Sequence, residues 1–265
     1  MNLTLGATTR PWSTLPFPEA CACIAGAGYS DVAIFASQGA IPITSATTPD
    51  EARAVADTAR QAGLVPSMLI CGVKLDGSVE EGVADHKRLI DATAAAGIPW
   101  LMNCGTEAPA TFDPFREIMR QCSPYAQDRG VALTMKPHGG IGLTGKMMTE
   151  TFELVNHPNF SICYDPGNII YYTKGAHRPE TDVADVAPHV GMCIIKDCVV
   201  VDDKSDVHLL PGEGWVDFPV VLGKLVEAGF TGPLYVECLG GSELDDINDR
   251  ARRTHGFVTD IIARL

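Results

Sequence analysis

Eight short apolar runs alternate with helical segments along the chain, and this alternation limits the fold more than any other feature of the sequence. The apolar runs lie at residues 2–6, 31–35, 64–70, 99–103, 131–135, 160–164, 190–195 and 233–236. In segments between them, such as residues 79–94 and 217–229, apolar residues recur at helical spacing. Strands that alternate with helices predict a parallel sheet covered by helices, which is the α/β class.

The segments between the runs also carry residues that start and end helices. Residues 48–51, with the sequence TPDE, match a capping box with proline at the first helical position, and Gly63 ends that segment. Asp113 and Pro114 repeat the opening pattern, and Gly130 repeats the closing one. These residues predict helices that start soon after one strand and end just before the next.

The joints between the predicted elements differ in length according to their direction. Helix-to-strand joints are short and often contain glycine, as at Gly97, whereas the strand-to-helix joints at 136–146, 165–179 and 196–216 are long. In a (β/α)8 barrel the strand-to-helix loops build the active site, so extra length belongs there. We therefore predict one (β/α)8 TIM barrel over residues 1–265. A doubly wound open sheet is the alternative, because periodicity does not show whether a sheet closes.

Charge and cysteine content exclude several classes of partner. The chain has 20 Lys and Arg against 33 Asp and Glu, a formal charge of −13 that would repel nucleic acid. Its nine cysteines are scattered and form no CxxC pair, which indicates a reducing compartment. The chain has no apolar run of membrane-spanning length and no signal peptide pattern at residues 1–12. We expect a cytoplasmic protein that binds neither nucleic acid nor membrane.

Polar residues follow the ends of the predicted strands. Asp165 is the most constrained, because it ends the apolar run FSICY, and a carboxylate there is costly unless it is paired or coordinated. The other candidates at strand ends or in the loops behind them are Arg10, Trp12, Lys136, His138, Asn168, Lys196, His208 and Glu237. In a barrel these residues would all face one mouth.

Five motifs in the second half of the chain carry a resemblance to a known family. TMKPHGG, ICYDPGN, IIKDC, LLPGEGWVDF and GPLYVE occur in this order. The ordered set resembles the sugar phosphate isomerase/epimerase superfamily of xylose-isomerase-like TIM barrels (AP endonuclease family 2 type). The resemblance implies a divalent metal held by a Glu after strand five, an Asp after strand six, a His on strand seven and a Glu after strand eight. Asp165 and Glu237 match, whereas Lys136 and Ile194 occupy the other two positions.

Two arrangements of the site follow from these substitutions, and we expect the first, in which a divalent metal assists the reaction. In the first, Asp165, Glu237 and His138 bind Mn²⁺, Co²⁺, Mg²⁺ or Zn²⁺ and leave positions open for substrate oxygens. In the second, the ammonium of Lys136 replaces the metal charge between the two carboxylates and stabilises an enolate. Lys136 could also form a Schiff base, although flanking carboxylates would raise its pKa and oppose this.

Each candidate also has a purely structural interpretation. Asp165 could cap the turn at Asn168, and Glu237 could simply pair with Lys136. His138 could be an ordinary hydrogen-bonded loop residue. Neighbouring Lys196 and Asp197 could form a structural ion pair, which we take as the more natural interpretation of that dipeptide.

The resemblance implies an isomerase or epimerase that removes a proton next to the carbonyl of a ketose or keto-sugar through an enediolate. The expected catalytic residues are Glu237 as base, Lys136 and His138. The expected substrate contacts are Arg10, Trp12, Asn168, Lys196 and His208. A lyase or dehydratase that eliminates a β-substituent is the first alternative, and a non-catalytic sugar-binding barrel or partner subunit is the second. We expect a small sugar as ligand, and a homo-oligomer is compatible with the sequence.

Overall fold

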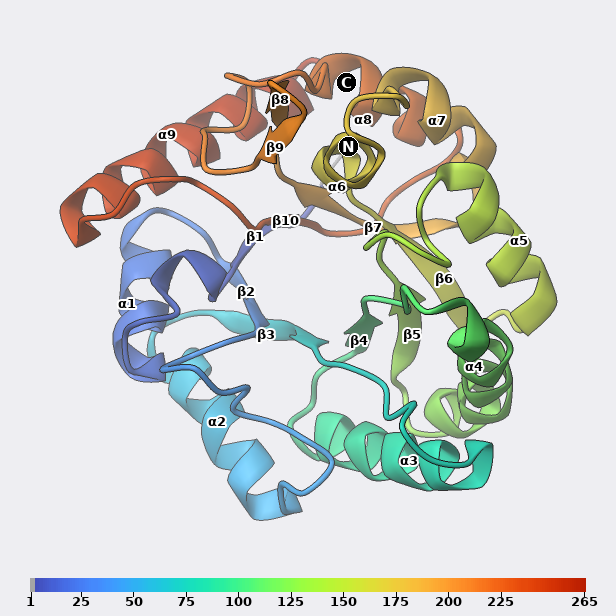
Figure 1. Cartoon of the computed structure of the whole chain (residues 1–265). Helices are drawn as coiled ribbons and strands as arrows, with labels where there is room; N and C mark the ends of the chain where they lie inside the picture. The colour runs from blue at the N-terminus through green and yellow to red at the C-terminus, as the bar shows by residue number, and fades with distance from the viewer. Residues whose placement is uncertain (1–2) are drawn as a thin grey trace.

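Strands spread over the whole described part of the chain, residues 3–265, close into an eight-stranded parallel barrel in this computed structural model (Figure 1). Around the barrel the strands follow the order β1-β10-β7-β6-β5-β4-β3-β2, and β2 pairs back with β1. The barrel strands are β1 (Leu5–Thr8), β2 (Asp31–Ile34), β3 (Val65–Ile70), β4 (Trp100–Asn103), β5 (Ala132–Met135), β6 (Phe160–Tyr164), β7 (Val190–Ile195) and β10 (Leu234–Val236). The predicted α/β TIM barrel is confirmed.

Helices surround the barrel on its outside (Figure 1). The α-helices are α1 (Phe17–Gly26), α2 (Pro49–Gln61), α3 (Val79–Ala95), α4 (Phe112–Gln127), α5 (Gly145–Val155), α6 (Pro166–Thr173), α7 (Pro179–Val186), α8 (Phe218–Glu227) and α9 (Leu244–Ile262). Short 3₁₀ turns lie at η1 (Arg10–Trp12), η2 (Pro109–Thr111) and η3 (Ala187–His189). Within residues 3–265, no helix combines the length and apolar character needed to cross a bilayer.

Local sequence signals place most element boundaries. The capping box between Thr48 and Glu51 is present at the start of α2. Helix α4 starts at Phe112, just before the predicted Asp113, because η2 runs directly into it. Seven of the eight predicted strands agree with the structure to within one residue. The first does not, since β1 starts at Leu5 and continues through Thr8, which pairs with Ala33 despite its polar side chain; the predicted start, residue 2, lies outside the described part.

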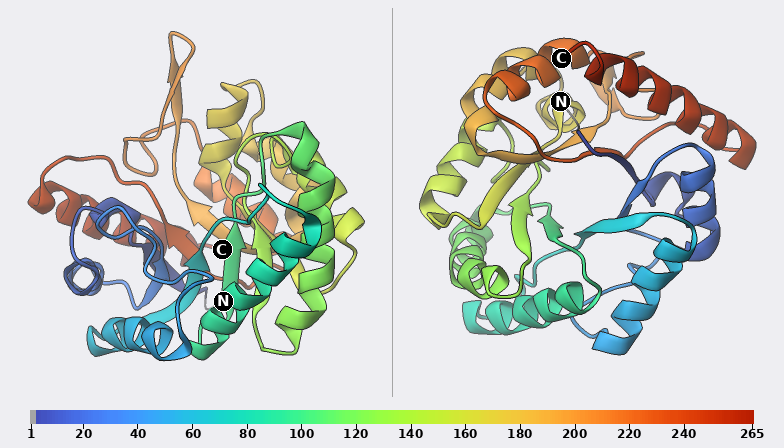
Figure 2. Two further views of the ribbon diagram at one scale, coloured as in Figure 1. Left: turned by 60° about the horizontal axis from the view of Figure 1, so that its bottom comes forward. Right: turned by 180° about the vertical axis from the view of Figure 1, so that it is seen from behind.

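The long loop after β7 contains an antiparallel hairpin that the sequence analysis missed. Its strands are β8 (Val199–Val201) and β9 (Lys204–Asp206), joined by Asp202 and Asp203 at φ values of 49° and 62°. Two consecutive left-handed residues make a tight hairpin turn, for which aspartate is among the better residues. Figure 2 shows the hairpin projecting beyond the barrel in its left view. The hairpin thus raises one wall above the barrel mouth.

The barrel interior is filled mainly by apolar side chains. Met68, Met102, Met192 and Ile194 belong to one fully buried cluster, together with Ala33, Ile70, Cys163 and Tyr235. Ile194 stands where the family resemblance implies a histidine, and its side chain fills the barrel with no exposed surface. A second, larger core lies between the strands and the helices. These two layers hold the C-terminal strand ends rigidly at the mouth.

A buried carboxylate lies at the N-terminal end of β2. Asp31 is 5% exposed and accepts a hydrogen bond from the Ser67 hydroxyl, which also contacts the Tyr235 hydroxyl. Burial raises the pKa of Asp31 to about 6, although hydrogen bonds from Ser67 and Tyr235 partly oppose the shift. The ionised form of Asp31 is therefore disfavoured in the folded protein.

Replacing Asp31 by Asn should make the protein more stable at neutral pH. Because folding raises this pKa from 3.8 to about 6, the native state loses stability as pH rises through this window. The loss corresponds to roughly 2–3 kcal/mol of unfolding free energy, which Asp31→Asn would avoid. Urea unfolding at pH 4.5 and 7.5 should show the gain at pH 7.5 and little at pH 4.5. Asp128→Asn, at an exposed aspartate, is the control and should leave stability unchanged. An equal gain for Asp31→Asn at both pH values, or an equal gain for Asp128→Asn, would contradict the assignment of the shifted pKa to Asp31.

Candidate active site

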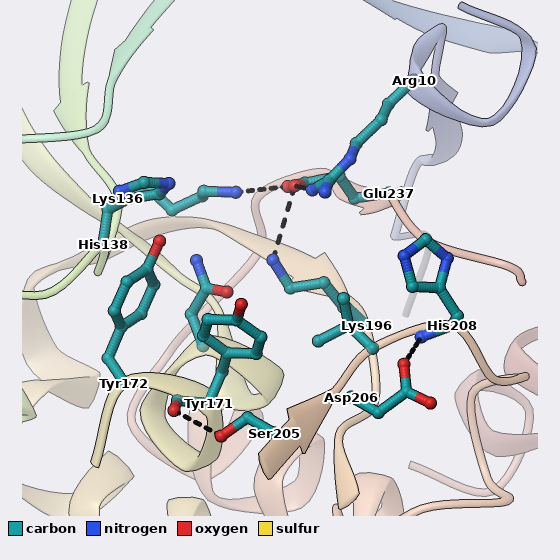
Figure 3. A pocket seen from close by; sticks show the side chains of 12 residues that line it. Arg10, Lys136, His138, Tyr171, Tyr172, Lys196, Ser205, Asp206, His208 and Glu237 are labelled. Atoms are coloured by element: carbon teal, nitrogen blue, oxygen red, sulfur yellow. Dashed lines mark hydrogen bonds and ion pairs between the residues drawn. The ribbon is translucent and has the colours of Figure 1, made fainter. Parts of the chain in front are cut away.

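Five charged residues meet at the C-terminal ends of the barrel strands. The Lys136 ammonium donates to Glu237 Oε2 and lies 3.2 Å from Asp165 Oδ2. The Lys196 ammonium lies 2.7 Å from Asp165 Oδ2 and 3.4 Å from Glu237 Oε1. Arg10 Nη1 donates to Glu237 Oε1 at 2.6 Å (Figure 3). We call these five residues the charged cluster.

The charged cluster is almost completely shielded from water. The side chains of Lys136, Asp165, Lys196 and Glu237 are at most 4% exposed, whereas that of Arg10 is 40% exposed. In such an environment electrostatic interactions are much stronger than at the surface, and an uncompensated charge is costly. The cluster therefore carries strong fields in a rigid setting, with Arg10 as its one solvent-facing member.

Mutual attraction fixes the charge states in the cluster. Burial by itself raises the pKa of Glu237, but Lys136, Lys196 and Arg10 together outweigh burial and hold this pKa well below its usual range. Burial by itself lowers the pKa of Lys136, but Glu237 and Asp165 outweigh it and raise this pKa well above its usual range. Glu237 is thus a carboxylate and Lys136 an ammonium at neutral pH.

The two oxygens of Asp165 have separate roles. Oδ1 accepts the backbone N–H of Asn168 at 2.9 Å and caps α6, whereas Oδ2 faces the two lysines. The Asn168 side chain donates to the carbonyl oxygen of Pro137 at 2.7 Å, which joins the loop after β5 to α6. Asp165 therefore caps α6 and also belongs to the charged cluster.

A polar cavity of about 190 Å³ opens directly above the cluster. Its lining residues are Arg10, Lys136, His138, Asn168, Tyr171, Tyr172, Lys196, Ser205, Asp206, Val207, His208 and Glu237. Figure 3 shows His138 and His208 on opposite sides of this space. A second cavity of about 210 Å³ shares four of these residues and adds Phe35, Ile70 and Cys104. The mouth therefore has a polar lobe and a more apolar one.

His138 lies at the rim of the cavity rather than between the carboxylates. Its ring packs against Tyr172 with centroids 4.8 Å apart, and Nδ1 lies 3.5 Å from Glu107 Oε1. Burial lowers the pKa of His138, and the charges of Lys136 and Lys196 lower it further. The imidazole is therefore largely neutral at pH 7 and able to accept a proton.

The structure brings most of the predicted site residues together, but not Trp12. Its side chain is 1% exposed in the core, and its indole N–H donates to Asn248 at 2.8 Å. The prediction that Trp12 contacts substrate is therefore not supported. The sequence analysis missed Ser205 and Asp206 because it missed the hairpin. The signal was the Asp202-Asp203 pair between a run of three valines at 199–201 and the polar residues 204–206.

The expected ion pair between Lys196 and Asp197 is not formed. Lys196 points to Asp165 and Glu237, whereas both oxygens of Asp197 accept backbone N–H groups, those of Cys198, Gly212, Gly214 and Val216. Successive side chains at a strand end point to opposite sides. This alternation separates the two neighbours and directs Lys196 into the cavity.

The side chains at the mouth do not fit a divalent metal. Among residues 3–265, no three His, Cys, Asp or Glu side chains are grouped as metal ligands, so His138 does not complete a set with Asp165 and Glu237. The ammonium groups of Lys136 and Lys196 occupy the space between the two carboxylates. Ammonium groups donate hydrogen bonds and repel cations, so this space does not suit a divalent metal.

Comparisons with known proteins place the chain in a family. It resembles the solved structures of D-psicose 3-epimerase with D-tagatose from Clostridium cellulolyticum H10 (TM-score 0.78, 11% identity, 98% of this chain and 99% of the other) and of a xylose isomerase-like TIM barrel protein from Mycobacterium smegmatis in complex with magnesium (0.75, 17%, 98% of each). D-allulose 3-epimerase from Methylomonas sp. is also similar (0.75, 17%, 98% of each). At these identities the likeness concerns the fold.

Curated protein sequences contain no significant match to this chain. The family model described as xylose isomerase-like TIM barrel matches residues 21–260 of this chain, which is most of the sequence. The chain therefore belongs to the xylose isomerase-like TIM barrel family.

Proposed function

We propose that this protein is a sugar isomerase or epimerase that removes a proton from the carbon next to the carbonyl of a ketose or keto-sugar. The observation that carries the proposal is the charged cluster, in which Glu237 lies among three cations at the base of a polar cavity. A carboxylate beside fixed positive charges is the combination needed to take a proton and to stabilise the enediolate that forms. The family supports sugar chemistry at this level.

Lys136 and Lys196 supply the positive charge for the enediolate. Both lysines line the cavity, and their ammonium groups pair with Asp165. The raised pKa of Lys136, in which Glu237 and Asp165 outweigh the opposing effect of burial, keeps it protonated and disfavours a Schiff base at this residue. Preorganised charges in a shielded site stabilise a developing oxyanion without reorientation.

Glu237 takes the proton, and His138, which lines the same cavity, returns one after it has itself taken up a proton from solvent. In the free site the cations weaken Glu237 as a base, but substrate oxygens that bind Arg10 and the lysines would draw their charge away and restore its basicity. The proton moves to Glu237, the carbon–hydrogen electron pair forms the new carbon–carbon double bond, and the π electrons of the carbonyl group move to its oxygen. Reprotonation of the same carbon from the other face by a second acid would give the epimer.

Solvent-deuterium exchange tests the proposal. Ketoses incubated with the protein in D₂O should lose the NMR signal of the proton next to the carbonyl and should retain their carbon skeleton. An unsaturated or dehydrated product would show instead that the enediolate expels a β-substituent, which is the lyase alternative. If calorimetry shows that the same sugars bind but neither exchange nor turnover occurs, the protein is a non-catalytic sugar-binding barrel instead.

Chelation separates the lysine arrangement from the metal arrangement implied by the family resemblance. Because the carboxylates are already paired with ammonium groups, exchange should continue at an unchanged rate after dialysis against EDTA. Elemental analysis of the same sample measures the metal that remains. Loss of exchange that Mn²⁺, Co²⁺ or Mg²⁺ restores would contradict the lysine arrangement.

A further inference from the structure

The charged cluster carries an excess of positive charge. Arg10, Lys136 and Lys196 face only Asp165 and Glu237, so three cations oppose two carboxylates and the net charge is +1. The protein as a whole carries a formal charge of −13. The four buried side chains balance one another, so the excess lies on Arg10, whose side chain is 40% exposed and open to an anion at the mouth.

The nearest other acids do not cancel this excess. Asp197 is buried, but its oxygens accept backbone N–H groups of residues 198–216 instead of facing the cluster. Asp206 lines the cavity but is exposed, and its Oδ1 accepts the backbone N–H of His208 at 2.7 Å. Glu107 is 64% exposed beside His138. Water and salt screen such exposed charges.

Hydrogen-bond donors for an anion are available on the same cations. In the part of the chain that the structure describes, the Arg10 side chain bonds through Nη1 alone, to Glu237. Its guanidinium is the solvent-facing member of the cluster and lines both lobes of the mouth. A guanidinium with unused N–H groups suits a carboxylate, which it binds through two parallel hydrogen bonds.

We infer that the substrate carries a carboxylate, so that the site acts on a keto-sugar acid rather than on a neutral ketose. The inference rests on the proposed function, because it adds the carboxylate to the same substrate. One carboxylate matches the +1 excess, with Arg10 as its principal partner and Lys136 and Lys196 left to face the carbonyl oxygen. A phosphate dianion carries more negative charge than the +1 of the cluster. A neutral ketose would leave this +1 without a counter-charge until the enediolate forms.

Binding of matched ligands tests the inference. D-Fructose and 2-keto-D-gluconate share one skeleton and differ at carbon 1, where the first has a hydroxymethyl group and the second a carboxylate. D-Fructuronate carries its carboxylate at the far end, and D-fructose 6-phosphate carries a phosphate there. By calorimetry, at least one carboxylate ligand should bind roughly 10- to 100-fold more tightly than D-fructose, as expected for charge-assisted hydrogen bonds. Equal binding of all four, or tightest binding of the phosphate, would overturn the inference.

Arg10→Leu provides the matching variant. It leaves two lysines opposite two carboxylates, so the buried charges balance and the fold should persist. The ratio of the affinities for the carboxylate ligand and for D-fructose should fall to about twofold or less. This is smaller than the ratio that a single charge-assisted hydrogen bond would produce. Arg252→Leu is the control, since Arg252 is exposed on α9 and pairs only with Asp249 among the described residues. An unchanged preference in Arg10→Leu would overturn the assignment.

The binding and exchange measurements distinguish a failure of the inference from a failure of the proposed function. If a keto-sugar acid binds tightly but none of the ligands exchanges its proton with D₂O, the inference stands and the proposed function does not. If D-fructose binds as tightly and exchanges as fast as 2-keto-D-gluconate and D-fructuronate, the proposed function stands and the inference does not. In that case the positive excess serves the enediolate alone.

Discussion

Replacing Glu237 by Gln should slow proton exchange next to the substrate carbonyl by roughly 10²- to 10⁴-fold, the range expected for loss of a positioned general base. Glutamine keeps the size of the side chain and can still accept one hydrogen bond from Arg10 or Lys136, but it cannot take a proton at neutral pH. NMR-monitored exchange in D₂O measures the effect directly. Undiminished exchange in Glu237→Gln would remove Glu237 from the mechanism.

Two controls separate chemistry from folding in this experiment. Glu237→Gln leaves three cations with Asp165 as their one remaining carboxylate, so some stability should also be lost. A double variant with Lys136→Met reduces that imbalance and should recover stability without recovering exchange. Glu213→Gln, at an exposed glutamate that pairs with Arg253, should leave both properties unchanged.

Replacing Asp165 by Ala should reduce the unfolding free energy by about 3–5 kcal/mol, the range for a buried ion pair that loses one partner. Asp165 has no exposed surface, and its Oδ2 faces Lys136 and Lys196. Its loss leaves three buried or half-buried cations facing Glu237 alone and removes the N-cap of α6. Urea unfolding monitored by circular dichroism measures the change.

A second helix cap in the same chain separates the two effects. Asp217 caps α8 by accepting the backbone N–H of Val220 at 3.2 Å, and it forms no ion pair within residues 3–265. Asp217→Ala should therefore cost only about 1 kcal/mol, the usual worth of a cap. Asp165→Asn keeps the shape and an acceptor for the cap but removes the charge, so it should resemble Asp165→Ala more than Asp217→Ala. Similar losses in Asp165→Ala and Asp217→Ala would show that Asp165 is merely a cap.

The barrel could be predicted because its determinants are local. Apolar runs with strand periodicity, the capping box at Thr48 and the glycines before the strands each act within a few residues, and together they define the alternation of strand and helix. Unequal joint lengths then indicate which end of the barrel carries the site. Asp165, Lys136 and Glu237 could be selected as candidates because each directly follows an apolar run, which is also a local signal.

The hairpin and the orientation of Lys196 could have been predicted but were not. The turn at Asp202 and Asp203 has the composition of a two-residue hairpin turn, although such a short pair of strands gives a weak signal within a long loop. Side-chain alternation beyond β7 separates Lys196 from Asp197, whereas adjacency in sequence suggested that they pair. Adjacent residues in an extended segment are poor partners for each other.

The sequence by itself determined the alternation of strand and helix, the polar residues that follow the strand ends, and the presence of Lys136 and Ile194 at two positions where the family resemblance implies metal ligands. Only the tertiary structure decided which charges meet: Glu237 bonds to Lys136 and Arg10 across 101 and 227 positions of the chain. Closure of the barrel brings these strand ends within hydrogen-bond distance, and burial then makes their charge balance matter. Ion pairing depends on distances and shielding that arise from closure, so no local pattern could have shown that two lysines and an arginine surround this carboxylate.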